Sequence, residues 1–171
     1  MKNFNLLVST SRSNEINAKS ELWFTLLMCG DMYPIISGIQ FPGLITALTN
    51  LSTEKFIIKV KKIIDKNPVF FQYILKIVPI DFICETDTKT IKFIIQENFK
   101  QFINEQDTFK IILKRRHHEK INRTNFIEEV AKNIENKVNL ENPDKIIRVE
   151  ILGKISGISI LNKNDIIKVK R

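Results

Sequence analysis

Cationic side chains are the residues of this chain that could do chemistry, and they gather at the end of an expected strand over residues 108–116. One face of that strand would carry Lys110, Lys114, Arg116 and His118, interrupted by Ile112. Alternate residues on a strand lie about 6.5–7 Å apart, close to the phosphate spacing of a nucleic-acid strand. The spacing is equally compatible with phosphate binding and with a solvated polar face. Nucleic-acid binding is therefore a hypothesis at this point.

Arginine use is the second sign of an anionic partner. The chain carries a net charge of +8, and residues 107–171 hold 15 Lys and Arg against 9 Asp and Glu. Only 6 of its 27 basic residues are arginines, and four of those are Arg115, Arg116, Arg123 and Arg148. Arginine is preferred where a planar fork must grip phosphate, so their concentration favours a polyanion. For Arg148 and Glu150, which would face outwards together from a later strand, we favour an ion pair within the strand.

Two blocks of expected elements must position these side chains. Residues 1–80 follow the order strand (4–10), helix (20–30), strand (33–39), strand (44–50), helix capped by Ser52, and strand (69–78). The order β-α-β-β-α-β is that of a ferredoxin-like domain.

The second block, residues 81–171, holds a helix over 88–105, the strand over 108–116 and a helix from the cap Asn122 to Val138. A structural turn at Asn142-Pro143-Asp144 leads to strands over 145–152 and 155–161, and residues 166–170 are a candidate edge strand. We thus predict an α+β fold of two domains, 1–80 and 81–171.

Catalytic patterns are missing from the sequence. It has five glycines, none spaced as a phosphate-binding loop, and no nucleophile elbow or His-carboxylate-nucleophile set. Cys29 and Cys84 sit in apolar surroundings typical of buried thiols. No apolar run approaches the roughly 20 residues of a membrane span, and no signal peptide is recognisable. We expect a cytoplasmic, non-enzymatic protein without a cofactor, a metal or a membrane partner.

The strings KRRHH at 114–118, KVNLENPD at 137–144 and VEILG at 149–153 resemble the core of a THUMP domain. Earlier motifs, such as residues 4–10, Gly30-Asp31 and Gly43-Leu44, are similar to the N-terminal ferredoxin-like domain of an archaeal adaptor family. The resemblance implies a mixed sheet with packed helices, binding to tRNA, and assistance to a separate tRNA cytidine acetyltransferase that forms 4-acetylcytidine. One departure is Asn139, where the family pattern suggests an aspartate.

Residue types, spacing and resemblance together define the expected RNA-binding set: Lys110, Lys114, Arg115, Arg116, His118, Arg123, Lys137 and Arg148. The partners implied are tRNA and the acetyltransferase. Two alternatives stay open: a small-ligand regulator with a ferredoxin-like pocket, and a protein-interaction module whose basic face docks an acidic partner.

Overall fold

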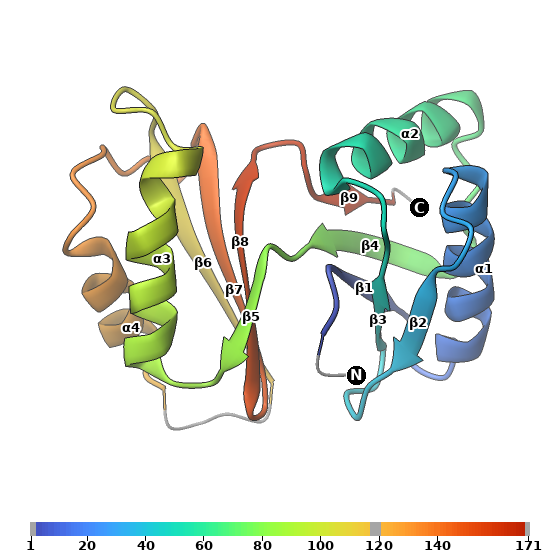
Figure 1. Cartoon of the computed structure of the whole chain (residues 1–171), viewed down its shortest axis with the longest axis horizontal. Coiled ribbons are helices and arrows are strands. Elements are labelled where there is room, and N and C mark those ends of the chain that lie inside the picture. Colours follow the sequence, from blue (N-terminus) through green and yellow to red (C-terminus); the bar gives the residue numbers. More distant parts are fainter. Residues whose placement is uncertain (1–2, 117–120, 170–171) are drawn as a thin grey trace. The chain divides into compact units, whose positions relative to one another are not determined.

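The fold consists of two compact units, seen in a computed structural model that describes residues 3–116 and 121–169 (Figure 1). The first unit comprises residues 1–80 with 165–171, and the second comprises residues 81–164. The sequence placed residues 165–171 with the second block, whereas residues 167–169 pair and pack with the first unit. Both units combine one sheet with two helices, and the predicted α+β fold class is confirmed.

The first unit has the ferredoxin-like order of elements. Its elements before residue 80 are β1 (Leu6–Thr10), α1 (Glu15–Met28), β2 (Ile35–Gly38), β3 (Leu44–Leu48), α2 (Thr53–Lys66) and β4 (Ile74–Pro79). The sheet order is β2-β3-β1-β4-β9, and every neighbouring pair is antiparallel. The short strand β9 (Ile167–Lys168) extends this sheet by pairing with β4.

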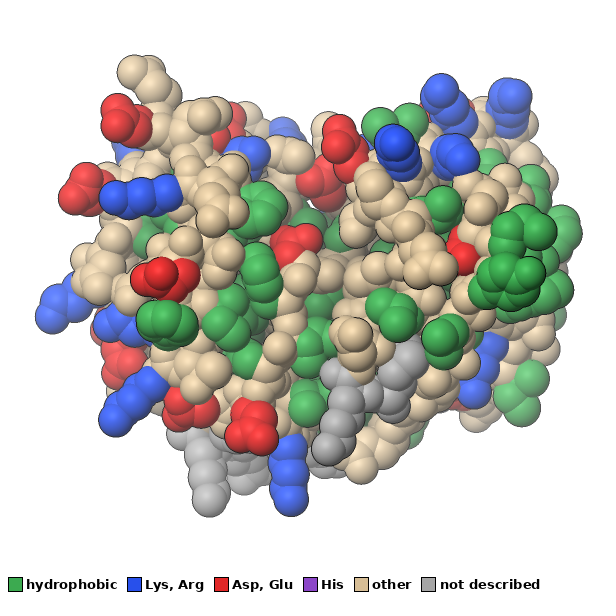
Figure 2. All heavy atoms as spheres, viewed as in Figure 1, with side chains coloured by type: hydrophobic (Ala, Val, Ile, Leu, Met, Phe, Trp, Pro, Cys, Tyr) green, Lys and Arg blue, Asp and Glu red, His purple; other side chains and the backbone are tan. Residues whose placement is uncertain are grey.

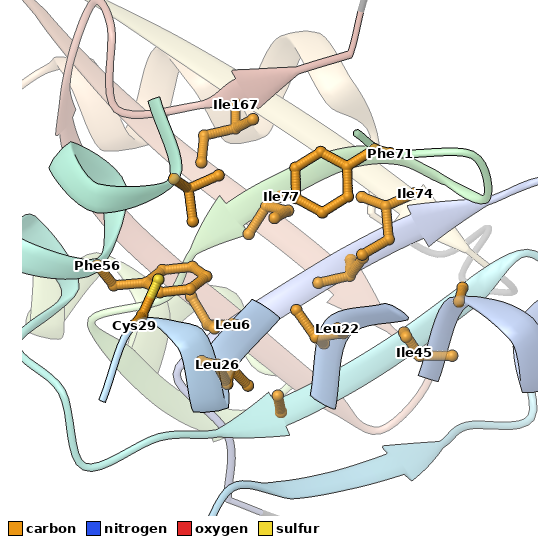
Figure 3. Close-up of a cluster of buried hydrophobic side chains, with 14 of the residues drawn as sticks. Leu6, Leu22, Leu26, Cys29, Ile45, Phe56, Phe71, Ile74, Ile77 and Ile167 are labelled. Atoms are coloured by element: carbon orange, nitrogen blue, oxygen red, sulfur yellow. The ribbon is translucent and has the colours of Figure 1, made fainter. Parts of the chain in front are cut away.

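The core of the first unit lies between its sheet and its two helices (Figure 3). Leu22 and Leu26 are four residues apart on α1, so they share the face that packs on the sheet, and both are fully buried. Phe56 of α2 is fully buried in the same core. Ile167 of β9 belongs to the same cluster. The C-terminal segment is therefore part of this core.

The fourth strand begins later than the predicted residue 69. A side chain of helix α1 forms hydrogen bonds with the backbone N–H groups at the point where the strand was expected. The carboxylate of Glu21 accepts hydrogen bonds from the backbone N–H groups of Gln72 (2.6 Å), Tyr73 (3.1 Å) and Ile74 (2.7 Å). Such charge-assisted bonds satisfy N–H groups that would otherwise need a strand partner. The strand β4 consequently begins only at Ile74.

The second unit begins with a strand that the sequence did not reveal. Its elements are β5 (Phe82–Glu85), α3 (Thr88–Phe102), β6 (Phe109–Arg116), α4 (Arg123–Ala131), β7 (Lys145–Leu152) and β8 (Ile155–Asn162). The sheet order is β5-β8-β7-β6, with β6 parallel to β7 and the other pairs antiparallel. A parallel pair requires a crossover connection, which α4 supplies. The strand β6 therefore forms one edge of the sheet.

Both predicted helix caps are confirmed by side-chain hydrogen bonds. Ser52 Oγ accepts the N–H of Lys55 at 3.3 Å, and Asn122 Oδ1 accepts the N–H of Asn125 at 3.1 Å. Each cap satisfies one of the N–H groups that a helix start leaves without an internal partner.

The helix after Asn122 is shorter than predicted, ending at Ala131 instead of Val138. Asn136 Nδ2 donates to the carbonyl oxygens of Asn104 (2.8 Å) and Asp107 (2.9 Å), which ties the chain to the α3–β6 connection. Val138 then forms a parallel bridge with Phe109. Of the apolar residues predicted beyond Ala131, Ile134 lies in the turn that follows the helix, and Val138 belongs to a strand-like segment beside β6.

Candidate nucleic-acid interface

Four of the expected cations lie where β6 ends and α4 begins. Lys114, Arg115 and Arg116 are the last three residues of β6, and Arg123 is the first residue of α4; all four are exposed. The start of a helix also presents backbone N–H groups and a positive dipole end, which favours bound anions. Strand end and helix start together form a basic surface, which we call the β6–α4 surface.

The alternation of side chains along β6 places Arg115 on one face of the strand and Lys114 and Arg116 on the other. Phe109, Ile111 and Leu113 are buried on the core side, as predicted. Arg115 continues that side beyond the core, and its guanidinium donates to the carbonyl oxygen of Ile121. Arg115 therefore holds the two ends of the β6–α4 connection together. Lys114 and Arg116 lie on the opposite face of the strand, where both are exposed.

A second pair of cations lies near the start of β6. Lys110 Nζ donates to the carbonyl oxygen of Leu140 at 3.3 Å, and Lys137 is exposed in the segment that runs beside β6. That segment is fixed by two backbone bonds, from Phe109 N–H to the Lys137 carbonyl (3.0 Å) and from Asn139 N–H to the Phe109 carbonyl (2.9 Å). Lys110 and Lys114 are four steps apart along the strand, about 13 Å. The basic residues thus follow the edge of the sheet in two groups.

Arg148 is buried, and the exposed position expected for it is wrong. Only 6% of Arg148 and 5% of Glu150 is exposed. The guanidinium of Arg148 donates from Nε to Glu150 Oε1 at 2.7 Å, and its NH2 group contacts the same oxygen. The ion pair within the strand is therefore confirmed. Because its charge is neutralised by Glu150, we leave Arg148 out of the proposed RNA-binding surface.

One further residue of the expected set cannot be placed. His118 lies outside the described residues, as does its neighbour His117.

The KVNLENPD string builds a loop held by its own side chains. Asn139 Oδ1 accepts the N–H groups of Glu141 (3.2 Å) and Asn142 (2.9 Å), while Asn139 Nδ2 donates to the Asn142 carbonyl (2.9 Å). An aspartate at this position could accept the first two bonds but could not donate the third. The asparagine that departs from the family pattern therefore closes the loop more completely than an aspartate would.

Asp144 joins the end of this loop to the start of β6. Its Oδ2 accepts from the N–H (2.8 Å) and the hydroxyl (2.7 Å) of Thr108. The Thr108 hydroxyl, followed by the Thr108 backbone N–H, lowers the pKa of the Asp144 carboxyl below its ordinary value. These contacts agree with a structural role for the Asn142-Pro143-Asp144 turn.

The lowered pKa of Asp144 predicts a pH-dependent contribution to stability. Its carboxylate stabilises the fold above the pKa of an unperturbed aspartate, about 3.9, and this contribution is lost as the pH falls through the lower folded-state pKa. We expect Asp144→Asn to lower the urea midpoint at neutral pH and to lower it progressively less in acid. Asp65→Asn, which removes an exposed carboxylate from α2, serves as the control. A deficit of Asp144→Asn that stayed constant from neutral pH down to pH about 2 would contradict the assignment.

A polar depression of about 400 Å³ beside this loop was not anticipated from the sequence. It is lined by residues of the α3–β6, β7 and β8 ends, among them Asn104, Asn142, Lys145, Asn162 and Lys163. Lys145 Nζ donates to Asn162 Oδ1 at 2.8 Å, and Lys163 Nζ contacts Asn142 Oδ1. Both ammonium groups are engaged by neighbouring amides, so the depression is best explained as a polar brace for the loop.

We also searched residues 3–116 and 121–169 for metal-binding groups and reactive cysteines. No group of three or more His, Cys, Asp or Glu side chains in those residues could hold a metal ion. Cys29 is buried and Cys84 half-buried, and burial raises the pKa of both thiols. A raised pKa lowers the thiolate fraction and so the reactivity. Every helix in these residues is too short or too polar to cross a membrane.

The sequence of the second unit matches a known domain family. Residues 86–161 match the family model of the THUMP domain, and they run from the start of α3 into β8. The match covers most of the second unit and less than half of the chain. A THUMP domain-containing protein 1 homolog from Drosophila melanogaster is 33% identical over 97 residues, which is 53% of this chain and 30% of the relative. The chain thus spans less than a third of that relative's length.

Solved structures share the fold of the whole chain. PH1313 from Pyrococcus horikoshii superposes with a TM-score of 0.67 at 17% identity, over 97% of this chain and 55% of that one. A 4-thiouridine synthetase solved as an RNA complex gives a TM-score of 0.54 at 16% identity, over 97% of this chain and 42% of that one. This chain therefore spans about half the length of these proteins. At such identities the likeness concerns the fold.

Proposed function

We propose that the protein binds tRNA through the β6–α4 surface and acts as a non-catalytic adaptor for a separate acetyltransferase that forms 4-acetylcytidine. The observation that carries the proposal is the group of exposed cations at the end of β6, within the segment that matches the THUMP family model. Lys114, Arg116 and Arg123 supply charge there, with Lys110 and Lys137 further along the same edge. The 4-thiouridine synthetase of similar fold was solved in complex with RNA, which supports RNA as the partner.

Phosphate recognition suits this surface better than base stacking does. Phe99, Phe109 and Phe126 are buried in the core of the second unit, and its exposed rings, Phe93 and Phe102, belong to α3 and not to the β6–α4 surface. Single-stranded RNA readers instead present exposed aromatic rings to the bases. We therefore infer that the backbone and shape of a folded RNA are recognised, which fits tRNA.

The adaptor role rests on the resemblance to the archaeal family and on the lack of a catalytic constellation in the described residues. In this proposal the acetyl transfer is carried out by another protein, and the chain contributes RNA binding. A protein-interaction module with a basic face remains the second candidate, because an acidic protein could also neutralise these cations.

Salt dependence separates the two candidates. Binding to tRNA through phosphates should fall linearly in a plot of log affinity against log salt, with a slope that reports the number of ionic contacts. The measurement is filter binding or fluorescence anisotropy with unfractionated tRNA at several salt concentrations. Absence of saturable tRNA binding at about 50–100 mM salt would reject the proposal and favour the protein-interaction module.

A further inference from the structure

The first unit presents an apolar surface that its own core does not use. Helix α1 buries Ala18, Leu22 and Leu26 at helical spacing against the sheet, yet it exposes about half of Trp23 and of Phe24. Other large apolar side chains exposed on α1 and on the segment leading into β2 are Ile16, Met28, Met32, Tyr33 and Ile35. Figure 2 shows apolar side chains gathered on the side of the unit where Figure 1 draws α1. Contiguous exposed apolar surface of this kind marks interaction sites.

A groove runs through this surface, between helix α1 and strand β2. Its volume is about 600 Å³, and its lining residues are Lys19, Ser20, Trp23, Phe24, Pro34 and Ile36. The strand β2 stands last in the sheet order and pairs only with β3 among the strands of the described residues. The floor of the groove is therefore the edge of a sheet, and its wall is a helix with two large aromatic rings.

Lys19 gives one end of the groove a positive charge. Its Nζ lies 3.1 Å from the position that a Cβ atom would occupy on Gly38, the last residue of β2. Glu15, one turn earlier on α1, accepts the N–H of Gly43 at 2.6 Å; this bond, with a smaller contribution from the charge of Lys19, lowers the pKa of the Glu15 carboxyl. Lys19 is accordingly the charged side chain among the residues that line the groove.

We propose that this groove binds an extended segment of a partner protein, added as a further strand beside β2. A strand that joins a sheet edge gains main-chain hydrogen bonds, and alternate side chains then point into the groove. Aromatic rings such as Trp23 and Phe24 are typical anchors for those side chains. The segment carries apolar residues at alternate positions and an acidic residue that meets Lys19 at the Gly38 end.

Charge argues for such a partner over a second copy of this chain. The chain carries a net charge of +8, so self-association through β2 would bring two cationic molecules, each with its Lys19, into contact. Like-charge juxtaposition opposes association, whereas an acidic segment is attracted. The proposal does not rest on RNA binding, since the groove and the β6–α4 surface belong to different units.

Selection from a library of random twelve-residue displayed peptides on the full chain tests the proposal. We expect the enriched peptides to share alternating apolar residues together with an Asp or Glu. The enriched peptide, labelled with fluorescein, should keep its affinity when saturating tRNA is added. A library without enrichment, or one enriched in basic or helix-forming sequences, would overturn the proposal.

Variants of the groove give the matched comparison. Trp23→Ser combined with Phe24→Ser should weaken binding of the enriched peptide at least about tenfold. The control, Ile58→Ser combined with Val69→Ser, removes exposed apolar side chains elsewhere in the first unit. It should leave the affinity for the peptide unchanged. Lys19→Glu should reverse the preference, favouring a peptide with Lys in place of its acidic residue. Equal affinities of the wild type and the Trp23/Phe24 variant would overturn the proposal.

Changes to the peptide test the same geometry without altering the protein. N-methylation of alternate amides on the edge that pairs with β2 should abolish binding, because strand addition needs those N–H groups. Unchanged affinity of the methylated peptides in both alternating registers would overturn strand addition. Sedimentation equilibrium provides the remaining check: a dimer of the wild type that the Trp23/Phe24 variant dissociates would assign the groove to a second copy and overturn the proposal.

Discussion

Replacing Lys114 and Arg116 together by alanine is expected to weaken tRNA binding about thirtyfold at 0.15 M salt. Each cation that neutralises one phosphate releases close to one counterion. At this salt concentration the release raises the association constant by about 0.7 log units. Two contacts therefore correspond to about 2 kcal/mol, and the log-log salt slope should flatten by about two. Fluorescence anisotropy with labelled tRNA at four or more salt concentrations measures both quantities.

The choice of these two residues follows from their contacts. Arg115 is left intact because its guanidinium donates to the Ile121 carbonyl, so its loss would also loosen the β6–α4 connection. Lys114 and Arg116 are exposed and lie on the same strand. Their removal should therefore change the charge of the surface without changing the fold of the unit.

A matched pair of cations on α3 controls for net charge. Lys89 and Lys100 are exposed in the same unit, and changing both to alanine removes the same formal charge. This variant should retain the wild-type slope and bind within about threefold of the wild type, because both lysines belong to α3 and neither is part of the β6–α4 surface. If both double variants lost affinity equally, tRNA would be held by net charge alone and the β6–α4 surface would lose its assigned role.

Local signals in the sequence were sufficient for most of the architecture. Ser52 and Asn122 cap helices through bonds to the N–H group three residues later, so the cap and its partner are both visible in a short window. The alternation of Phe109, Ile111 and Leu113 likewise identifies the buried face of β6. Where cause and effect lie within one element, residue types and spacing predict the structure.

Pairings between distant segments escaped the sequence. Strand β5 has four residues and follows β4 after only two residues, so its identity comes from pairing with β8 near the far end of the chain. Strand β9 has two residues and belongs to the first unit because it pairs with β4. The four residues of β5 carry too few side chains for a period of two to be recognised, whereas β9 was expected as an edge strand and only its pairing with β4 was missed.

In the candidate site, too, the features that depend on a single element were predicted and those that depend on distant packing were missed. The exposure of Lys114 and Arg116 follows from their place at the end of a strand, and the sequence predicted it. Alternation also placed Arg148 and Glu150 on one face together, but it carries no information on whether that face is covered. The groove between α1 and β2 was missed for a related reason, because Trp23 and Phe24 look like core residues until the face that packs is known.

4-Acetylcytidine is expected to form in tRNA at its full rate only when this chain and a separate acetyltransferase act together. In the proposed adaptor role, the chain alone should transfer no acetyl group from acetyl-CoA, because its sequence has no phosphate-binding loop and no His-carboxylate-nucleophile set. The acetyltransferase alone should be slower by at least about tenfold, a difference of about 1.4 kcal/mol in the barrier, because holding the tRNA raises the local concentration of the target. The measurement is nucleoside analysis by mass spectrometry after timed incubation.

The Lys114/Arg116 variant connects this reaction to the proposed surface. At tRNA concentrations below the wild-type dissociation constant, the variant should lose most of the stimulation, and raising the tRNA concentration should restore it, because binding alone is impaired. The Lys89/Lys100 variant should stimulate like the wild type. Acetylcytidine formed by this chain alone would make it an enzyme. An acetyltransferase that reached its full rate without the chain would leave tRNA binding without the adaptor role.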